Sequence, residues 1–258
     1  MQPVLFEIKN SVGLITLNRP DKFNSFNRDM ALLFQKYLDE CANDELTRAV
    51  YITGAGKAFS AGQDLGELTG ENPPGMEVIL SEHYNPIIKK IRELQKPVVA
   101  AVNGVAAGAG ANIALCCDVV LATASASFIQ AFSKIGLIPD SGGTFFLPRL
   151  IGFQKASAIM MLGDKIPATE AEKMSMIYKV FPDENFATES FAIAETLAAM
   201  PTKGLAFTKQ ALNNSMYNSL EEQLKLEDNL QSKAAHTDDY IEGVAAFIEK
   251  RIPVFKGK

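Results

Sequence analysis

A stretch of small residues at 101–118 has the composition of a backbone that approaches a ligand. Residues 101–112 hold three glycines and five alanines, and such a backbone turns tightly and brings its N–H groups close to a bound group. From about Gly108 the residues favour a helix, whose start offers unpaired N–H donors and the positive end of its dipole. The stretch therefore indicates a site for negative charge on an oxygen. A glycine-rich helix start that only packs closely on a strand remains the competing interpretation.

Two other glycine-rich motifs, both for nucleotide binding, are excluded by one or two residues each. A dinucleotide-binding fingerprint over 108–113 needs a third glycine where Ile113 stands. A phosphate-binding loop at 54–57 needs glycine at position 51 and Ser or Thr at position 58, where the chain has Tyr51 and Ala58. The sequence therefore predicts neither a dinucleotide site nor a nucleoside-phosphate site at these turns.

Alternating strands and helices must position the glycine-rich turns. Two short β-type runs predict a hairpin at the start of the chain, and four apolar runs predict buried strands. These strands are expected at 4–8, 12–17, 48–53, 97–102, 118–122 and 177–181. Helical spacing predicts helices at 27–41 and 76–95, the second interrupted by Pro86, with a loop at 66–75 between them.

Helices dominate beyond residue 145. They are expected at about 154–162, 169–175, 184–199, 203–216 and 220–235, followed by a last helix capped by Thr237. The order of strands and helices before that point predicts parallel strand pairing through crossover helices. The fold class is therefore α/β, with a helical C-terminal region.

Composition excludes several functional classes. A net charge of −5 with no basic run argues against a nucleic-acid partner, and no apolar run reaches membrane-spanning length. Cys41, Cys116 and Cys117 lack the spacing of a disulfide framework, which predicts a reduced, cytoplasmic protein with no targeting peptide. His83 and His236 lie far apart without a Cys/His cluster, so no metal site is expected.

Four motifs in order resemble the enoyl-CoA hydratase/isomerase, or crotonase, superfamily, and the match runs nearly end to end. They are Phe-Ser-Ala-Gly-Gln-Asp at 59–64, Asn-Gly-x-Ala-x-Gly-x-Gly at 103–110, Gly-Leu-Ile-Pro-Asp-Ser-Gly-Gly-Thr at 136–144 and Gly-Val-Ala-Ala-Phe-Ile-Glu-Lys-Arg at 243–251. The resemblance implies a ClpP-like spiral of ββα units over 1–195. It also implies a helical trimerisation region over 196–258, with assembly into homotrimers or hexamers.

The resemblance also implies a binding site for an acyl-CoA thioester. Its enolate would be held by the backbone N–H groups of Ala61 and Ala109, with Gly108 as the alternative second donor. Coenzyme A, which is part of the substrate rather than a separate cofactor, would contact Lys22, Asn24, Ala61, Gly62, Gln63, Asp64, Leu65, Phe247 and Lys250. The lysines would attract its phosphates, although Lys22 is equally consistent with an ordinary solvated charge.

The type of reaction depends on three positions. Hydratases of the family use two glutamates where this chain has Asn112 and Phe132, and neither residue can hold and deprotonate a water. Asp140 stands where those hydratases have glycine. A single carboxylate beside an oxyanion site suits a double-bond shift, because one base takes a proton and returns it at another carbon.

An apolar acyl pocket formed beside Phe132, Ile138 and Phe145 should raise the pKa of Asp140. The competing interpretation is that Asp140 only caps the helix that follows. Tyr84 could border the same pocket, but packing is the favoured role for it.

Residues 131–144 and the ending Phe-Lys-Gly-Lys resemble more narrowly the isomerases of phenylacetate degradation. Those enzymes convert ring-1,2-epoxyphenylacetyl-CoA to oxepin-CoA and shift enoyl-CoA double bonds, and their aspartate matches Asp140. Phe145-Phe146 departs from the aromatic–aliphatic pair typical of those enzymes. The departure concerns the shape of the acyl pocket, and so the identity of the substrate, rather than the mechanism. The alternatives are a Δ3,Δ2-enoyl-CoA isomerase or a hydratase of fatty-acid oxidation, and a non-catalytic crotonase-fold binding protein.

Overall fold

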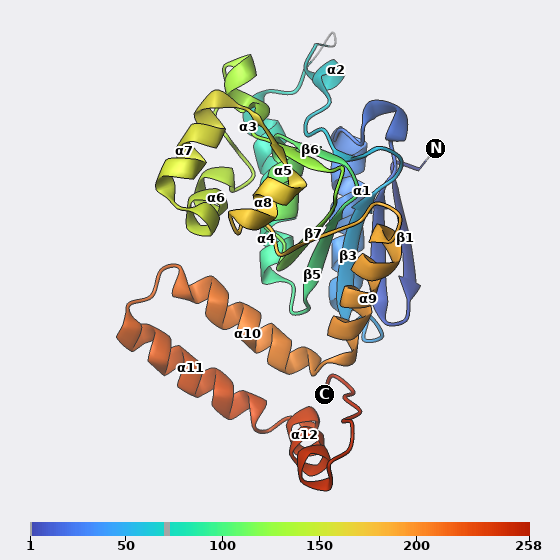
Figure 1. Cartoon of the computed structure of the whole chain (residues 1–258), viewed down its shortest axis with the longest axis vertical. Helices are drawn as coiled ribbons and strands as arrows, with labels where there is room; N and C mark the ends of the chain where they lie inside the picture. Colours follow the sequence, from blue (N-terminus) through green and yellow to red (C-terminus); the bar gives the residue numbers. More distant parts are fainter. Residues whose placement is uncertain (1, 70–72) are drawn as a thin grey trace.

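The computed structural model describes residues 2–69 and 73–258 (Figure 1). Its larger sheet has the strand order β1-β2-β3-β5-β7-β10. The predicted hairpin is confirmed: β1 (Val4–Lys9) pairs antiparallel with β2 (Val12–Leu17) through Asn10 and Ser11, whose φ angles of 51° and 61° suit a two-residue turn. The parallel strands are β3 (Ala49–Gly54), β5 (Val98–Val102), β7 (Val119–Thr123) and β10 (Lys179–Phe181).

A second sheet of four short strands stands beside the first, with the order β4-β6-β8-β9. Its strands are β4 (Ala58–Ser60), β6 (Val105–Ala107), β8 (Ser127–Ile129) and β9 (Lys165–Pro167). Strands β3, β5 and β7 of the large sheet are each followed by one of these short strands and then by helical segments. This repeat is the spiral of ββα units that the sequence predicts.

The helices between β4 and β5 form one wall of the site. The segment α2 (Leu65–Leu68) overlaps the predicted loop 66–75, so the loop prediction is wrong at 66–68, and residues 70–72 of that loop lie outside the described residues. The predicted interrupted helix is confirmed as α3 (Met76–Val78), the π-helix η2 (Ile79–Tyr84) and α4 (Asn85–Glu93). Pro86 is the second residue of α4, directly after the π-helix η2.

The remaining core helices cover both faces of the sheets. They are α1 (Arg28–Asn43), α5 (Ala109–Leu115), α6 (Gly143–Ile151), α7 (Phe153–Leu162), α8 (Ala168–Lys173) and α9 (Phe186–Ala199), with the short 3₁₀ turns η1 (Pro20–Lys22) and η3 (Ala131–Ile135). In α1, the predicted apolar face is buried and Asn27 caps the first turn. The predicted division after residue 195 falls inside α9, which packs on β3.

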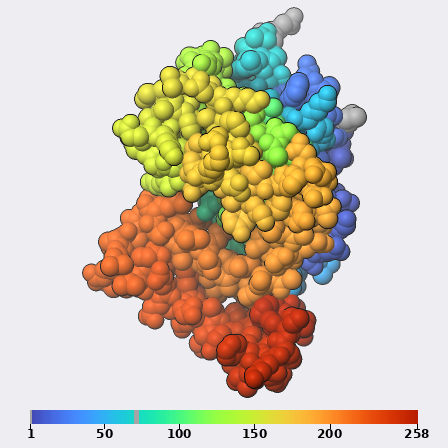
Figure 2. All heavy atoms as spheres, viewed as in Figure 1, coloured from blue at the N-terminus to red at the C-terminus, as the bar shows by residue number. Residues whose placement is uncertain are grey.

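Three C-terminal helices extend away from this core (Figures 1 and 2). They are α10 (Thr202–Ser215), α11 (Leu220–Ala234) and α12 (Asp238–Glu249), and Thr237 caps α12 as predicted. Between α10 and the core lies a hollow of about 400 Å³ that is lined by Arg92, Phe145 and Tyr217, among others (Figure 2). Across the described residues, no helix combines the length and the apolar character that crossing a membrane requires.

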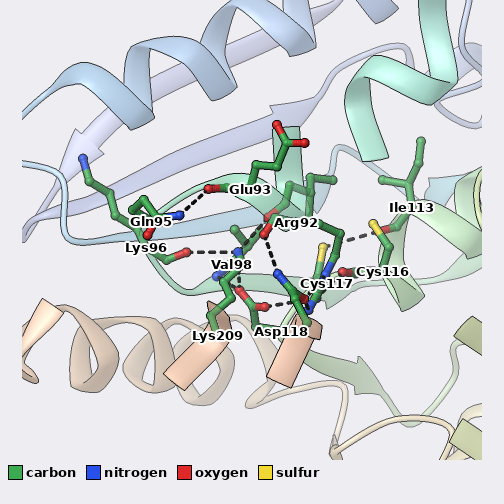
Figure 3. A network of polar contacts seen from close by, with 12 residues as sticks. Arg92, Glu93, Gln95, Lys96, Val98, Ile113, Cys116, Cys117, Asp118 and Lys209 are labelled. Carbon is green, nitrogen blue, oxygen red and sulfur yellow. Dashed lines mark hydrogen bonds and ion pairs between the residues drawn. The ribbon is translucent and has the colours of Figure 1, made fainter. Parts of the chain in front are cut away.

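A partly buried ion cluster ties α10 to the core (Figure 3). The Asp118 carboxylate, at the start of β7, accepts from Arg92 Nη1 at 3.1 Å, Lys209 Nζ at 2.8 Å and the Val98 N–H at 2.8 Å. Lys209 on α10 also donates to the carbonyl of Ile91 at 2.7 Å. One carboxylate therefore joins α4, β5 and α10.

Candidate active site

The two glycine-rich turns that follow β4 and β6 meet face to face. A Cβ added to Gly62 would lie 2.9 Å from the Ala107 oxygen and 3.2 Å from the Ala109 nitrogen. A Cβ added to Gly110 would lie 2.5 Å from the Ser60 oxygen. These contacts are possible only because neither glycine carries a side chain, so the small residues of both motifs bring two backbones together.

Two of the three predicted oxyanion donors are already hydrogen-bonded. The Ala61 N–H donates to the Phe23 carbonyl at 2.9 Å, and the Gly108 N–H donates to the Ile129 carbonyl at 2.9 Å. Neither group is therefore free for a substrate oxygen. The structure thus disagrees with the assignment of Ala61 as the first donor, and it leaves Ala109 rather than Gly108 as the second.

Gln63 and Ala109 have backbone N–H groups without an acceptor among the described residues. Phe26 donates to the Gly62 carbonyl at 2.7 Å and accepts from the Asp64 N–H at 2.8 Å, so the Gln63 N–H between them faces away from Phe26. The Ala109 N–H is the first of α5 and has no helical partner. Both residues line the same cavity, which makes their amides the available donors.

That cavity has a volume of about 200 Å³ and a mostly apolar wall. It is lined by residues of both turns, of η2 and η3, and by Asp140. The lining residues are Ala61, Gln63, Leu65, Leu68, Met76, Ile79, Tyr84, Gly108, Ala109, Ala131, Phe132, Lys134, Ile135, Leu137 and Asp140. The cavity therefore brings the free amides and the predicted carboxylate to one place.

Burial raises the pKa of the Asp140 carboxyl above its ordinary value, and a hydrogen bond from Ser141 Oγ at 2.8 Å opposes this shift. The direction agrees with the prediction. Asp140 does not cap the following helix, because α6 begins at Gly143 after Gly142 and has no side-chain cap. The capping interpretation is therefore wrong, and the carboxylate is left to face the cavity.

Only one of the three predicted apolar neighbours of Asp140 lies in this cavity. Phe132 lines it, as expected. Ile138 is 80% exposed, and Phe145 points into the hollow beside α10, where its ring stacks on Tyr217 at 5.6 Å. These two predictions were wrong because closeness along the chain does not determine the side to which a side chain turns.

Asn112 and Phe132, at the positions of the hydratase glutamates, are both buried. The Asn112 side chain donates to the Asp140 carbonyl at 2.8 Å and accepts from Gln130 Nε2 at 2.7 Å. Phe132 lies over the turn at Gly108. Neither position can accept a proton from water in this arrangement.

Tyr84 is a site residue for which the sequence favoured a packing role. Its ring lines the cavity, and its hydroxyl donates to Gln63 Oε1 at 2.9 Å. Gln63 Nε2 in turn donates to Glu67 at 2.7 Å. Burial raises the pKa of Tyr84 well above its ordinary value, and the nearby Asp140 charge adds to the shift. The residues beside it in the sequence, Ser81 to Asn85, carry no signal of this role.

The predicted coenzyme A contacts fall into two groups. Lys22 and Leu65 are exposed on the side of the molecule that carries the glycine turns, and Asp64 there pairs with Arg19 at 2.8 Å. Asn24 is fully buried, and its side chain donates to the carbonyls of Ala55 and Ala58.

The second group lies on α12. Phe247 is 86% exposed, and neither Phe247 nor Lys250 lines the cavity that contains Asp140. In Figure 1, α12 lies at the opposite end of the molecule from α2 and α5. The structure therefore does not bring these two residues to the site of their own chain.

Comparisons with known proteins agree with this geometry. Residues 7–258 match the family model described as enoyl-CoA hydratase/isomerase. The chain is 44% identical to a 1,2-epoxyphenylacetyl-CoA isomerase from Escherichia coli K12 and 33% identical to a 2,3-dehydroadipyl-CoA hydratase from the same organism, each over 100% of both chains. A crystal structure of an enoyl-CoA hydratase from Bacillus anthracis superposes with a TM-score of 0.93 at 34% identity, over 100% of both chains.

Proposed function

Because the chain belongs to the enoyl-CoA hydratase/isomerase family, we propose that it is an acyl-CoA isomerase with Asp140 as its acid and base. The observation that carries the proposal is one carboxyl of raised pKa in a cavity that also holds two free backbone amides. In this proposal the N–H groups of Gln63 and Ala109, rather than those of Ala61 and Ala109, hold the thioester oxygen.

The double-bond shift needs one proton and one oxyanion site. Asp140 takes a proton from the α-carbon of a 3-enoyl thioester, and the electron pair of that C–H bond moves into the thioester as an enolate. The two N–H groups stabilise the negative oxygen, and each such donor typically contributes about 10²–10³ in turnover. The protonated Asp140 then returns the proton at the γ-carbon, which gives the conjugated 2-enoyl thioester.

Hydration is the less favoured reaction. Both polar ends of the Asn112 side chain are hydrogen-bonded within the protein, and Phe132 has no group that exchanges protons. Addition of water needs a second residue that orients and deprotonates it. Asp140 is the only carboxylate among the residues of the described cavity wall.

For the acyl group we propose the ring-epoxide of phenylacetyl-CoA, which would rearrange to the oxepin through the same oxyanion site. The 44% identity to the isomerase that carries this substrate in its name and the apolar cavity beside Phe132 support it. An aliphatic 3-enoyl-CoA of fatty-acid oxidation is the second candidate, because it needs the same base and the same two amides.

We further propose that the protein works as a homotrimer or a hexamer in which a second copy supplies Phe247 and Lys250 to the coenzyme A site. The position of α12 far from its own cavity supports this arrangement. The exposed apolar side chains of that helix and the following tail, Ile248, Ile252 and Val254, support it as well.

The test is to follow conjugated-thioester absorbance with a 3-enoyl-CoA and, separately, with a 2-enoyl-CoA. The proposal expects absorbance to rise with the first and to persist with the second. Asp140→Asn should lower turnover at least about 10²-fold, the usual contribution of a general base, without weakening binding of a saturated acyl-CoA. Rapid loss of the 2-enoyl signal would establish hydration instead, and near-normal turnover of Asp140→Asn would remove Asp140 from the mechanism.

A further inference from the structure

The proposed base lies in a segment that has little rigidity of its own. Residues 137–142 form neither helix nor strand, and the two residues after Asp140 adopt positive φ angles, 51° at Ser141 and 73° at Gly142. The turn is closed by one backbone hydrogen bond, from the Gly143 N–H to the Asp140 carbonyl at 2.8 Å. The position of the carboxylate therefore depends on what else holds this carbonyl.

Asn112 supplies that second contact from α5. Its Nδ2 donates to the Asp140 carbonyl at 2.8 Å, and its side chain is 1% exposed. The two segments approach so closely that a Cβ on Gly143 would lie 2.4 Å from Asn112 Nδ2. Asn112 stands three residues after Ala109, so the helix that begins with an oxyanion donor also holds the base one turn later.

Gln130 fixes which way the Asn112 amide faces. Its Nε2 donates to Asn112 Oδ1 at 2.7 Å, which leaves Nδ2 to donate to Asp140. Gln130 is itself 1% exposed, and its Oε1 has no hydrogen-bond partner among the described residues. A buried acceptor without a donor is unfavourable for folding, so packing alone gives no reason for glutamine at this place.

We propose that Asn112, held by Gln130, is a positioning residue that fixes Asp140 relative to the Ala109 amide. This inference rests on the proposed function, because it assumes that Asp140 is the base. The role of Asn112 and Gln130 is then not only that they cannot catalyse hydration. The side-chain amide of Asn112 also fixes the distance between the Asp140 carboxylate and the Ala109 N–H, between which the substrate must fit. Neither Asn112 nor Gln130 exchanges a proton or touches the acyl group.

The experiment compares Asn112→Ala and Gln130→Met with the unchanged chain. Asn112→Ala should lower kcat for the 3-enoyl-CoA about 10²-fold, the effect of a misplacement near 1 Å, while the affinity for a saturated acyl-CoA stays within about twofold. Gln130→Met should also lower kcat, but with little change in melting temperature, because it removes the unpaired Gln130 Oε1 while it leaves Asn112 Oδ1 unpaired, so the number of unpaired buried acceptors stays the same. This second variant keeps the test valid if Asn112→Ala does not fold.

A pH–rate profile separates positioning from general destabilisation. Tyr84 on η2 and Lys134 on η3 are the other titratable residues that line the cavity with Asp140, and both are unchanged in these variants. An Asp140 carboxylate that is no longer held in place becomes more exposed to solvent, so its kinetic pKa should fall toward the ordinary value of 3.8.

Tyr51→Phe is the control, because it removes a buried hydrogen bond to Ser190 Oγ at 2.8 Å between β3 and α9. It should lower the melting temperature but leave kcat and the profile unchanged.

Each result has one interpretation. Unchanged kcat and pH profile in both Asn112→Ala and Gln130→Met would overturn the positioning role, even if Asp140→Asn is inactive. An active Asp140→Asn would instead overturn the proposed function, and the role of Asn112 with it.

Discussion

At the scale of single residues, the burial of Asp140 that suits catalysis should be unfavourable for folding. A carboxyl whose pKa is raised in the folded state binds protons more tightly when folded than when unfolded. Its contribution to stability is therefore fully present below the unfolded pKa of 3.8 and is lost as the pH rises through the folded pKa. At neutral pH the ionised side chain is a net cost.

Asp140→Asn should accordingly stabilise the protein while it abolishes isomerisation. We expect a melting temperature higher by roughly 2–4 °C at pH 8, the shift that about 1 kcal/mol produces in a chain of this size. The gain should shrink as the pH is lowered toward 4, because a growing fraction of the wild-type carboxyl is then protonated. Thermal unfolding followed at pH 4 to 8 checks this, and a gain independent of pH would contradict the electrostatic cause.

The sequence predicted Asp140 but not the amide of Gln63. A carboxylate in a motif can be recognised from residue type alone. The direction of its pKa shift was predicted correctly, although only Phe132 of the three apolar neighbours expected beside it lines the cavity. The direction of a backbone N–H is not encoded by residue type at the same position. It is set by the bridge between Phe26 and Gln63, which joins distant parts of the chain.

At the scale of secondary-structure elements, the attachment of α10 depends on the Asp118 cluster. Burial lowers the pKa of Lys209, and the facing Asp118 carboxylate opposes this shift. Removing one member of a buried ion cluster leaves the others less well compensated, which typically costs about 3 kcal/mol or more.

Lys209→Met should therefore destabilise the chain by about 3 kcal/mol in thermal or urea unfolding. Lys203→Met is the matched control on the same helix, since Lys203 is exposed. Its effect should stay within about 0.5 kcal/mol. Equal effects of the two substitutions would show that the cluster does not anchor α10.

Long elements were predicted well, and short ones were not. Strands β1, β2, β3, β5 and β7 and the helices beyond residue 150 were placed close to their observed bounds, because each contains enough residues to show a pattern. The three-residue strand β10 was predicted because it lies within a longer β-type run at 177–181. Strands β4, β6, β8 and β9 have three residues each. Three residues cannot establish an alternation, so the second sheet was missed although it carries both glycine-rich turns.

At the scale of the whole molecule, the C-terminal helices leave apolar side chains in solvent. Phe247 and Ile252 are each 86% exposed, and Ile248 is 72% exposed. Exposed apolar side chains gathered on one element mark an interaction surface. The family resemblance predicted that Phe247 and Lys250 contact coenzyme A, but the sequence of one chain does not specify which chain's cavity they serve.

Specific activity should therefore depend on protein concentration. Dilution below the dissociation constant of the assembly should raise the KM for the CoA ester, because Phe247 and Lys250 leave the neighbouring site. Phe247→Ala should raise KM about tenfold with little change in kcat, the loss of a well-packed interface aromatic. Phe153→Ala, which removes an aromatic side chain that is 74% exposed on α7, is the control and should not change KM. Sedimentation analysis showing an active monomer would contradict the shared site.

The oxyanion site proposed here consists of main-chain atoms, and that has an evolutionary consequence. Every residue type except proline carries a backbone N–H, so most substitutions at positions 63 and 109 leave the two donors in place as long as the glycines beside them keep the turns close. Change can then accumulate at positions 112, 132 and 140, where side chains decide how protons move. A lineage can thus acquire a different reaction on the same bound thioester by replacing a few residues. Each intermediate form still stabilises an enolate.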